Sequence, residues 1–297
     1  MRYIELIARV APADVERASD VLRDVTGADT WNERPFAQPD LESDAMVDGR
    51  AAATVHAYAR EAQAAAEADA RLALVRHEIP AELTVRLVDE EDWAESWKEH
   101  FHVEHIGDRI VVVPTWRTYH ARPGDVVIAL DPGMAFGTGQ HGTTRMCLES
   151  LERRVRPGDR VLDVGCGSGI LSIAAAKLGA AAVDAVDVDA DCVRITSENA
   201  RLNGVDVRAA LGSLGSAWPF GEAAAGYDAV VANVIARVII DLAPDLVGAL
   251  APSGRLIVSG VIAEREEEVR DALAAAGARV DGVRAAGEWR CIEAVRA

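Results

Sequence analysis

The sequence feature that most constrains the fold is a short apolar run that leads into a glycine-rich turn, within residues 161–179. Asp163 stands near the end of the apolar run, and glycines then alternate at Gly165, Gly167 and Gly169 before an Ala/Leu/Ile-rich segment. This pattern predicts a strand, a tight turn and a helix, the opening of a nucleotide-type α/β unit. Glycine lets the backbone of such a turn approach a ligand closely, because no Cβ stands in the way.

A second predicted strand follows at residues 182–188 and carries the acid Asp187, 22 residues after Gly165. An acid at this distance is suited to accept hydrogen bonds from the two ribose hydroxyls of a ligand. A dinucleotide site would favour glycine at position 170, where this chain has Ile170. The spacing instead resembles motif I of the S-adenosylmethionine (AdoMet) methyltransferases, Asp-x-Gly-x-Gly-x-Gly. A merely structural glycine turn is the alternative, and the acids on both sides of the turn argue against it.

Predicted strands alternate with predicted helices through the rest of the chain. The strands are at residues 161–164, 182–188, 205–210, 227–234 and 255–261, and the helices between them at 190–202, 237–250 and 264–276. Two final strands, 278–284 and 289–295, predict an antiparallel pair. The fold class is therefore α/β, with a doubly wound, mostly parallel, Rossmann-like sheet that ends in a hairpin.

The amino-terminal part shows a different pattern. Strands are predicted at residues 3–10, 53–58 and 83–88, with helices at 12–25 and 61–78 between them. This order suggests a small α+β domain of ferredoxin-like type. We expect a substrate-docking domain at 1–90, a connector at 91–125 and a methyltransferase domain at 126–297. The connector includes strands at 109–116 and 125–130, after a helix at 89–101 whose apolar stripe is more typical of packing than of cofactor binding.

The charge balance bears on the partners. The chain has 31 basic and 48 acidic residues, a formal net charge of −17, and residues 1–92 contribute −10 of it. An enzyme acting on nucleic acid usually presents a basic face, so this balance argues against direct nucleic-acid binding. An acidic module favours a basic partner, although a solvated surface that keeps the protein soluble is an equal alternative.

Cysteine usage and hydropathy complete the prediction. The four cysteines are scattered without a Cys-x-x-Cys pair, so we expect neither a disulfide framework nor a metal site. No apolar run is long enough to cross a membrane, and the first residues lack the apolar core of a signal peptide. We therefore expect a cytoplasmic protein, monomeric and without membrane contact.

Residues 131–144, Asp-Pro-Gly-Met-Ala-Phe-Gly-Thr-Gly-Gln-His-Gly-Thr-Thr, form a second informative segment. This segment contains four glycines and a proline and opens a predicted helix over 143–154, with Thr143 or Thr144 near its amino terminus. A flexible linker is the alternative. A linker seldom carries Met, Phe, His and paired Thr among its glycines, so we expect this loop to close over a ligand.

These segments together resemble the bacterial PrmA methyltransferases, which modify ribosomal protein L11. The hallmark of that family, Asp-Pro-Gly-x-Ala-Phe-Gly-Thr-Gly-x-His-x-Thr-Thr, matches residues 131–144, and its Asn-Ile/Val-x-Ala strand end matches 233–236. Its motif I matches 163–169 and its Asp-x-Asp matches 187–189. The chain departs from the family at Gln140 and Gly142, where Thr and Pro are common. A glycine in place of proline loosens the loop.

The resemblance implies AdoMet as cofactor and amino groups of L11 as substrate, lysine side chains and also the amino terminus. It implies that Gly165 and Gly167 contact the cofactor and that Asp187 holds the ribose. The methionine end is then covered by the loop that contains Phe136 and Gly137, and by Thr144.

Asn233 is the predicted catalytic residue, which we also expect to contact the cofactor. It stands at the carboxyl end of a strand, where open α/β sheets bind ligands. Its carbonyl oxygen can orient an incoming amine, while the alternative is that it caps the following helix. His141 shows no partner in the sequence and is left outside the catalytic set.

Three other functions compete with this prediction. A nucleic-acid amino-methyltransferase would carry Asn/Asp-Pro-Pro-Tyr at the strand end, whereas residues 233–236 contain neither proline nor an aromatic residue. A related group of enzymes methylates lysines of electron-transfer flavoprotein with a similar catalytic domain. A non-catalytic AdoMet-binding protein is the third, and the intact motif residues argue against it. Which amines are methylated, and how many times, is not readable from the sequence.

Overall fold

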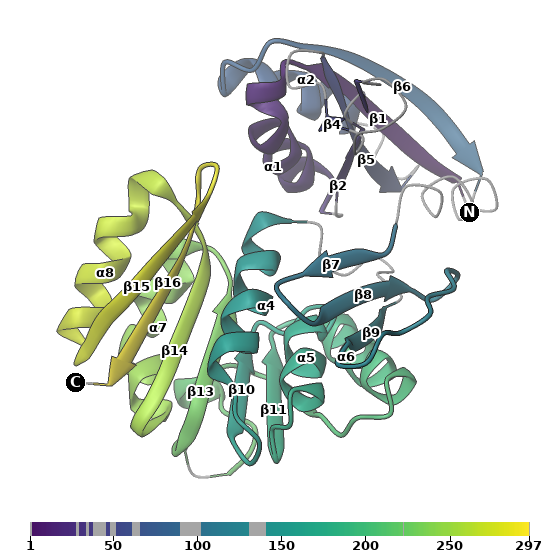
Figure 1. Ribbon diagram of the computed structural model, residues 1–297. Coiled ribbons are helices and arrows are strands. Elements are labelled where there is room, and N and C mark those ends of the chain that lie inside the picture. Colours follow the sequence, from purple (N-terminus) through teal and green to yellow (C-terminus); the bar gives the residue numbers. More distant parts are fainter. Residues whose placement is uncertain are drawn as a thin grey trace. The chain divides into compact units, whose positions relative to one another are not determined.

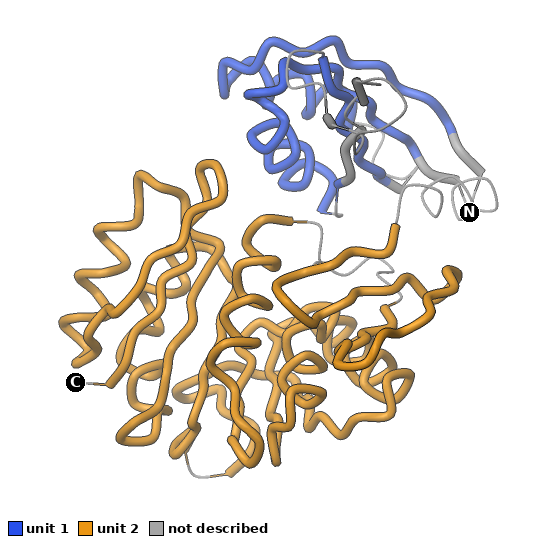
Figure 2. Tube along the Cα trace, in the orientation of Figure 1, with its two compact units in different colours: residues 1–101 blue, residues 102–297 orange. Residues whose placement is uncertain are grey.

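A computed structural model of the chain describes residues 2–27, 30–33, 36–37, 46–47, 52–60, 66–89, 102–130, 141–221 and 223–296. Its contacts divide the chain into two compact units, Met1–Phe101 and His102–Ala297 (Figure 2). The aromatic stripe predicted over 89–101 and the loop predicted over 131–140 lie outside the described residues. Among the helices that are described, none is both long and apolar enough to cross a membrane.

The amino-terminal unit contains a four-stranded antiparallel sheet in the order β2-β5-β1-β6. Its main elements are β1 (Arg2–Val10), η1 (Pro12–Asp14), α1 (Val15–Thr26), β2 (Thr30–Glu33), β5 (Ala53–Arg60), α2 (Ala66–Arg76) and β6 (Ala81–Asp89). A further two-stranded sheet pairs β3 (Phe36–Ala37) with β4 (Met46–Val47). This strand–helix–strand order and sheet order are those of the ferredoxin-like type that the sequence suggests.

Successive side chains of β1 alternate between the two faces of this sheet, and one face packs against apolar side chains. Leu6, Ala8 and Val10 point to one face and join the same buried cluster as Val15 and Leu22 of α1. The helix ends at Gly27, whose left-handed φ of 68° and hydrogen bond back to Arg23 form the cap that glycine favours.

The opposite face of the same sheet buries a charge. Glu5 is fully buried and accepts hydrogen bonds from His56 Nδ1 and Tyr58 OH, each 2.9 Å long, and from Arg86. Burial alone would raise the pKa of Glu5, but these bonds outweigh it and lower the pKa to about 2. This carboxylate therefore stays charged, and its three partners tie β1 to both neighbouring strands.

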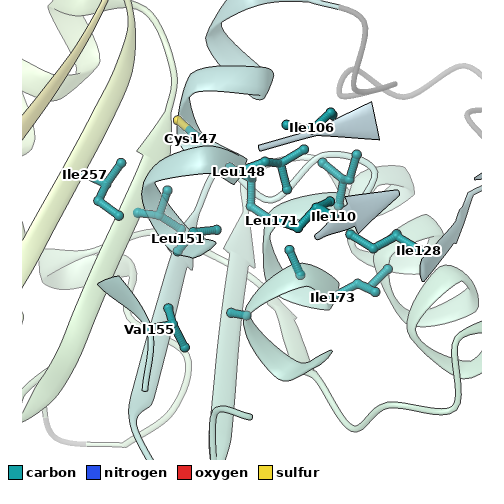
Figure 3. Packing of buried hydrophobic residues seen from close by; sticks show 14 of the residues in the cluster. Ile106, Ile110, Ile128, Cys147, Leu148, Leu151, Val155, Leu171, Ile173 and Ile257 are labelled. Carbon is teal, nitrogen blue, oxygen red and sulfur yellow. The ribbon is translucent and has the colours of Figure 1, made fainter. Parts of the chain in front are cut away.

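The carboxyl-terminal unit begins with a small sheet in the order β7-β8-β9. β7 (Glu104–Ile106) is antiparallel to β8 (Ile110–Pro114), which is parallel to β9 (Val126–Leu130). Its buried isoleucines pack into the cluster that also contains Leu148 and Leu151 of α4 (Gly142–Arg154) and Leu171 of α5 (Ile170–Lys177) (Figure 3). These strands thus share a core with the large sheet that follows them.

The large sheet has seven strands in the order β12-β11-β10-β13-β14-β16-β15 (Figure 1). The first five are parallel, and β16 is antiparallel to both of its neighbours. The strands are β10 (Arg160–Val164), β11 (Ala182–Asp187), β12 (Arg208–Leu211), β13 (Tyr227–Asn233), β14 (Leu250–Ile262), β15 (Ala278–Ala286) and β16 (Trp289–Arg296). The helical segments between them are α5 (Ile170–Lys177), α6 (Ala190–Leu202), η2 (Gly215–Ala217), α7 (Ala236–Ala249), η3 (Ala263–Arg265) and α8 (Glu266–Ala275). The prediction of a doubly wound, mostly parallel sheet with a final hairpin is confirmed.

Two strand starts differ from the prediction by three residues or more. β12 begins at Arg208 instead of residue 205, and β14 begins at Leu250 instead of residue 255. The pairing register of β13 and β14 shifts between Tyr227 and Ala229, which accommodates the extra residues. At Gly254 a Cβ would lie 2.6 Å from the Tyr227 carbonyl oxygen. Glycine at this position therefore allows β14 to lie close to the start of β13.

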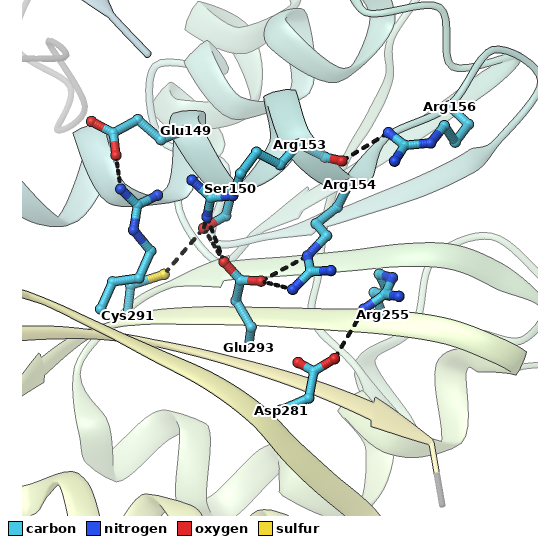
Figure 4. Close-up of polar contacts among 10 residues, drawn as sticks. Glu149, Ser150, Arg153, Arg154, Arg156, Arg255, Asp281, Cys291 and Glu293 are labelled. Carbon is cyan, nitrogen blue, oxygen red and sulfur yellow. Dashed lines mark hydrogen bonds and ion pairs between the residues drawn. The ribbon is translucent and has the colours of Figure 1, made fainter. Parts of the chain in front are cut away.

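A buried carboxylate joins α4 to the end of the sheet. Glu293 of β16 accepts hydrogen bonds from Ser150, Arg153 and Arg154, with lengths of 2.7–2.8 Å (Figure 4). Burial would raise the pKa of Glu293, but these donors reverse the effect and lower it. This contact fixes the carboxyl end of α4. The amino end of the same helix lies beside Asn233, at the end of β13.

Candidate active site at the sheet edge

The carboxyl ends of three adjacent strands bring most of the predicted site residues together. β10 lies between β11 and β13 in the sheet, and all three run parallel. Asp163, Asp187 and Asn233 stand at or near the ends of these strands, although 70 residues separate the first from the last. This edge is where open parallel sheets bind ligands.

The glycine turn between β10 and α5 uses left-handed backbone at three positions, with φ of 78° at Gly165, 52° at Gly167 and 81° at Gly169. Side chains are also excluded by close neighbours. A Cβ at Gly165 would lie 2.5 Å from Val234 Cγ1, and one at Gly169 would lie 2.9 Å from Thr196 Cγ2. Both the backbone angles and the packing therefore require glycine.

Asp187 ties the turn to the next loop. Its Oδ2 accepts from the Gly167 N–H over 2.9 Å and its Oδ1 accepts from the Asp189 N–H over 3.0 Å. A carboxylate offers about four acceptor positions. Asp187 is half-buried, so lone pairs remain for hydroxyl donors of a ligand. Asp187 thus lies in direct contact with the glycine turn.

Helix α6 holds the turn from the other side, through residues that sequence reasoning missed. Thr196 Oγ1 donates to the Gly167 carbonyl over 3.0 Å, and Asn199 Nδ2 donates to the Ser168 carbonyl over 2.9 Å. Both side chains are buried. Their spacing of three residues placed them on one helix face, but nothing in the sequence indicated what that face contacts.

Asp163 is fully buried behind the turn. Ser172 Oγ donates to its Oδ2 over 2.6 Å, and its Oδ1 has no hydrogen-bond partner among the described residues. Burial raises the pKa of Asp163 to about 7; the Ser172 hydrogen bond opposes the shift and the charge of Asp187 adds to it. A buried acceptor without a donor is costly, so this oxygen is suited to a cationic or donor group of a ligand.

Asn233 meets Thr144 at the start of α4. The Asn233 amide nitrogen donates to Thr144 Oγ1 over 3.2 Å, and Thr144 is fully buried. The alternative that Asn233 caps α7 is wrong, because the cap position is Ile235, which makes no side-chain capping bond. Asn233 is instead held by a helix 89 residues away in sequence.

The threonines predicted near the start of the helix lie within the first turn of α4 and are buried. His141 occupies the cap position, and its side chain accepts from the Thr143 N–H. Sequence reasoning did not assign this capping role to His141. Phe136 and Gly137, predicted to cover a ligand, lie outside the described residues.

Two exposed apolar side chains complete the edge. Val188, directly after Asp187, is 80% exposed, and Leu211, the in-register partner of Asp187 on β12, is 56% exposed. Sequence reasoning missed both, because an apolar residue at the end of a strand is normally counted with the core. Apolar surface beside a carboxylate suits a ligand with a flat ring next to a sugar.

A metal site is not apparent at this edge. Among residues that the structure describes, no three His, Cys, Asp or Glu side chains gather so that they could hold a metal ion. The chemistry of the edge therefore consists of carboxylates, an amide, a hydroxyl and backbone groups.

Comparisons with known proteins show the family of the chain. The sequence profile of the family described as Ribosomal protein L11 methyltransferase (PrmA) matches residues 2–297. The chain is similar to a ribosomal protein L11 methyltransferase of Symbiobacterium thermophilum, with 48% identity over 211 residues that cover 71% of this chain and 68% of that protein. A second relative, from Pelotomaculum thermopropionicum and of the same name, is 39% identical over 312 residues, with 99% of both chains covered.

A solved structure extends the comparison to the fold. The ribosomal protein L11 methylase from Lactobacillus delbrueckii subsp. bulgaricus is 35% identical, with a TM-score of 0.61. The match covers 66% of this chain and 99% of that one. Because the profile spans nearly all residues and a relative matches along the whole length, the chain belongs to the ribosomal protein L11 methyltransferase (PrmA) family of class I methyltransferases.

Proposed function

We propose that this chain transfers methyl groups from AdoMet to amino groups of ribosomal protein L11, chiefly lysine side chains. The contact between Asn233 and Thr144 carries the proposal. Because the Asn233 amide nitrogen is occupied by Thr144 Oγ1, its orientation is set, and Oδ1 is the acceptor that remains. A carbonyl oxygen presented in this way can accept from an amine N–H and direct the nitrogen lone pair.

The described residues fit AdoMet as the cofactor. The unpartnered Asp163 Oδ1 suits a positively charged group, and AdoMet carries both an ammonium and a sulfonium. Asp187 suits the ribose hydroxyls, and the exposed Val188 suits the adenine ring. Gly165 and Gly167 leave the turn open to close approach. Contacts from Phe136 and Gly137 stay predictions of the family resemblance.

AdoMet, when bound, supplies a methyl group that is activated by the positive charge on sulfur. The residues of the chain then have to orient a neutral amine. A lysine amine has a pKa of about 10.4 in water, so it must lose a proton before it can attack. A partly buried site disfavours the charged ammonium, and Asn233 Oδ1 accepts from the neutral amine without adding charge. We therefore assign Asn233 to amine orientation and assign no side chain as a base, so that the ammonium releases its proton to solvent water. The C–S bond to the methyl group breaks as the new C–N bond forms, with S-adenosylhomocysteine as the leaving group.

Features of the whole chain support L11 as the substrate. The relative from Pelotomaculum thermopropionicum matches along 99% of both chains, which includes the amino-terminal unit. That unit is acidic, so it suits a basic protein and disfavours a phosphate backbone. We propose that residues 1–90 dock the substrate, that the enzyme acts as a monomer, and that it works in the cytoplasm, where ribosomal proteins are made.

The test of this function is methylation of purified L11. Wild-type enzyme with isotope-labelled AdoMet should label L11, and peptide mass spectrometry should place the label on amines. Label on electron-transfer flavoprotein with none on L11 would overturn the substrate assignment.

Asn233→Ala provides the test of the site within that assay. We expect the single-turnover rate to fall by about 10²-fold, by analogy with the loss of one positioned hydrogen-bonding group. Affinity for AdoMet, measured by calorimetry, should change far less, since the turn and Asp187 stay intact. Normal single-turnover chemistry in a variant with a lowered melting temperature would show a structural role only.

A further inference from the structure

The chain contains one histidine of the site region whose role the proposed function leaves open. His141 precedes the first turn of α4, with φ of −69° and ψ of 138°, which is extended backbone. Its carbonyl accepts from the Arg145 N–H over 3.1 Å, the first i to i+4 bond of the helix. His141 is thus the N-cap residue by backbone as well as by side chain.

The imidazole caps the helix through one ring nitrogen. His141 Nδ1 lies 3.4 Å from the Thr143 backbone nitrogen, which donates to it, and 2.7 Å from Thr143 Oγ1. Capping of this kind uses the tautomer in which Nδ1 holds a lone pair, because an acceptor nitrogen carries no proton. In that tautomer the Nδ1 lone pair is engaged with the helix and not with a substrate amine.

Packing holds the ring in this orientation. The imidazole stands edge-on against the indole of Trp289, with ring centroids 5.0 Å apart and planes at 68°. Trp289 opens β16 and is only 9% exposed. The next residue, Gly142, leaves so little room that a Cβ there would lie 3.3 Å from Ala286 Cβ. The β15–β16 hairpin therefore supports the start of α4.

The cap acts on the residue that contacts Asn233. Thr144 lies one turn after His141, and its hydroxyl accepts from the Asn233 amide. The order of contacts runs from Trp289 to His141, through the first turn of α4 to Thr144, and then to Asn233. We propose that His141 is a positioning residue, an imidazole cap that sets the first turn of α4 and so orients Asn233.

The residue type is informative in itself. Asn, Asp and Ser are the usual cap residues, and histidine is not among the preferred ones. An amide or hydroxyl would cap the helix without reaching the indole, whereas imidazole provides both an acceptor and a flat ring for Trp289. The dual contact accounts for histidine at this position.

The inference rests on the proposed methyl transfer for its functional consequence, but not for the capping itself. The test therefore uses two variants and two readouts. His141→Asn retains an acceptor for the Thr143 N–H and cannot take a proton from an amine. His141→Ala removes the acceptor and the ring together. Hydrogen exchange of the amides at residues 143–146 reports capping without cofactor or substrate, and single-turnover methylation of L11 reports the consequence for Asn233.

We expect His141→Ala to raise exchange at these amides and to lower the single-turnover rate, each by about fivefold, which corresponds to the loss of one helix cap. His141→Asn should restore both to within about threefold of wild type, since asparagine is among the best caps. The amides at the start of α7, whose cap residue Ile235 makes no side-chain bond, serve as the internal reference.

Two outcomes would overturn the inference. Unchanged exchange in His141→Ala would show that the imidazole does not cap α4, and this holds whether or not methylation is observed. A rate in His141→Asn that is as low as in His141→Ala, with exchange restored, would assign His141 to chemistry rather than to positioning. Absence of methylation in the wild type would count against the proposed function alone.

Discussion

At the scale of single residues, the surroundings of Asp163 disfavour its charge more than those of any other described acid. It is fully buried, Ser172 is its hydrogen-bond partner, and the charge of Asp187 repels it. Its pKa of about 7 in the folded chain lies above the ordinary value near 3.8. The fold therefore favours the protonated acid, and this contribution to stability is present below about pH 4 and is lost as pH rises through 7.

A cationic ligand reverses that preference. If a positive group of AdoMet meets Asp163 Oδ1, the ligand binds best to the ionised acid, so affinity should rise as pH increases from about 5.5 to about 7, by up to about tenfold per pH unit. Calorimetry across this range would measure it. Asp163→Asn keeps the shape and the acceptor for Ser172 but cannot ionise, so its affinity should be weaker and nearly independent of pH. Parallel pH profiles in the two proteins would rule out this role of Asp163.

At the scale of elements, α6 organises the backbone around the site. Thr196 and Asn199 donate to the glycine turn, and Asn203, just after the helix, exchanges two hydrogen bonds with the backbone of Ala129 in β9, over 2.8 and 2.6 Å. The positions i, i+3 and i+7 lie on one face of the helix. One helix therefore sets the positions of two backbone segments that are distant in sequence.

Thr196→Val tests whether the hydrogen bond from α6 to the glycine turn matters for AdoMet binding. Valine retains the shape and removes the donor to the Gly167 carbonyl, so we expect a loss of about 1 kcal/mol in AdoMet affinity, near fivefold, by calorimetry. Ser197→Ala is the matched control, because the Ser197 hydroxyl donates to Val193 of its own helix. Equal affinities in both variants, or a loss in the control alone, would contradict an organising role for this face of α6.

At the scale of the whole molecule, the described part of the chain has separate apolar cores in its two units. One cluster spans residues 6–83, and the other two lie within residues 106–294. The carboxyl-terminal unit contains the glycine turn, Asp187, Thr144 and Asn233. We therefore expect it to fold and to bind AdoMet without residues 1–101, because its core is its own.

A truncated chain that begins at His102 separates binding from docking. It should bind AdoMet with unchanged affinity and lose methylation of L11 by at least about tenfold in kcat/KM, because capture of the protein substrate falls to the missing unit. A short lysine peptide at high concentration should be methylated equally by both chains, which controls for damage to the site. Full activity of the truncated chain on L11 would refute the docking role.

Local patterns in the sequence determined the fold class and several site residues. Alternating strands and helices predicted the doubly wound sheet, because the periods of apolar residues reflect which face each element buries. The glycines at 165, 167 and 169 predicted the turn, because left-handed backbone and close packing exclude other residues. Asp187 and Asn233 were placed at strand ends, and the carboxyl ends of parallel strands share one edge of a sheet.

The tertiary structure alone decided which partners those residues meet. The contacts of Asn233 with Thr144, of Asp187 with Gly167 and of Thr196 with the turn join segments 89, 20 and 29 residues apart. Such contacts follow from sheet register and helix packing, which no local pattern encodes. The same holds for the cap of α4, where His141 packs against Trp289 from a strand 148 residues later in the chain. Burial likewise raised the pKa of Asp163, because desolvation depends on every element packed around the acid.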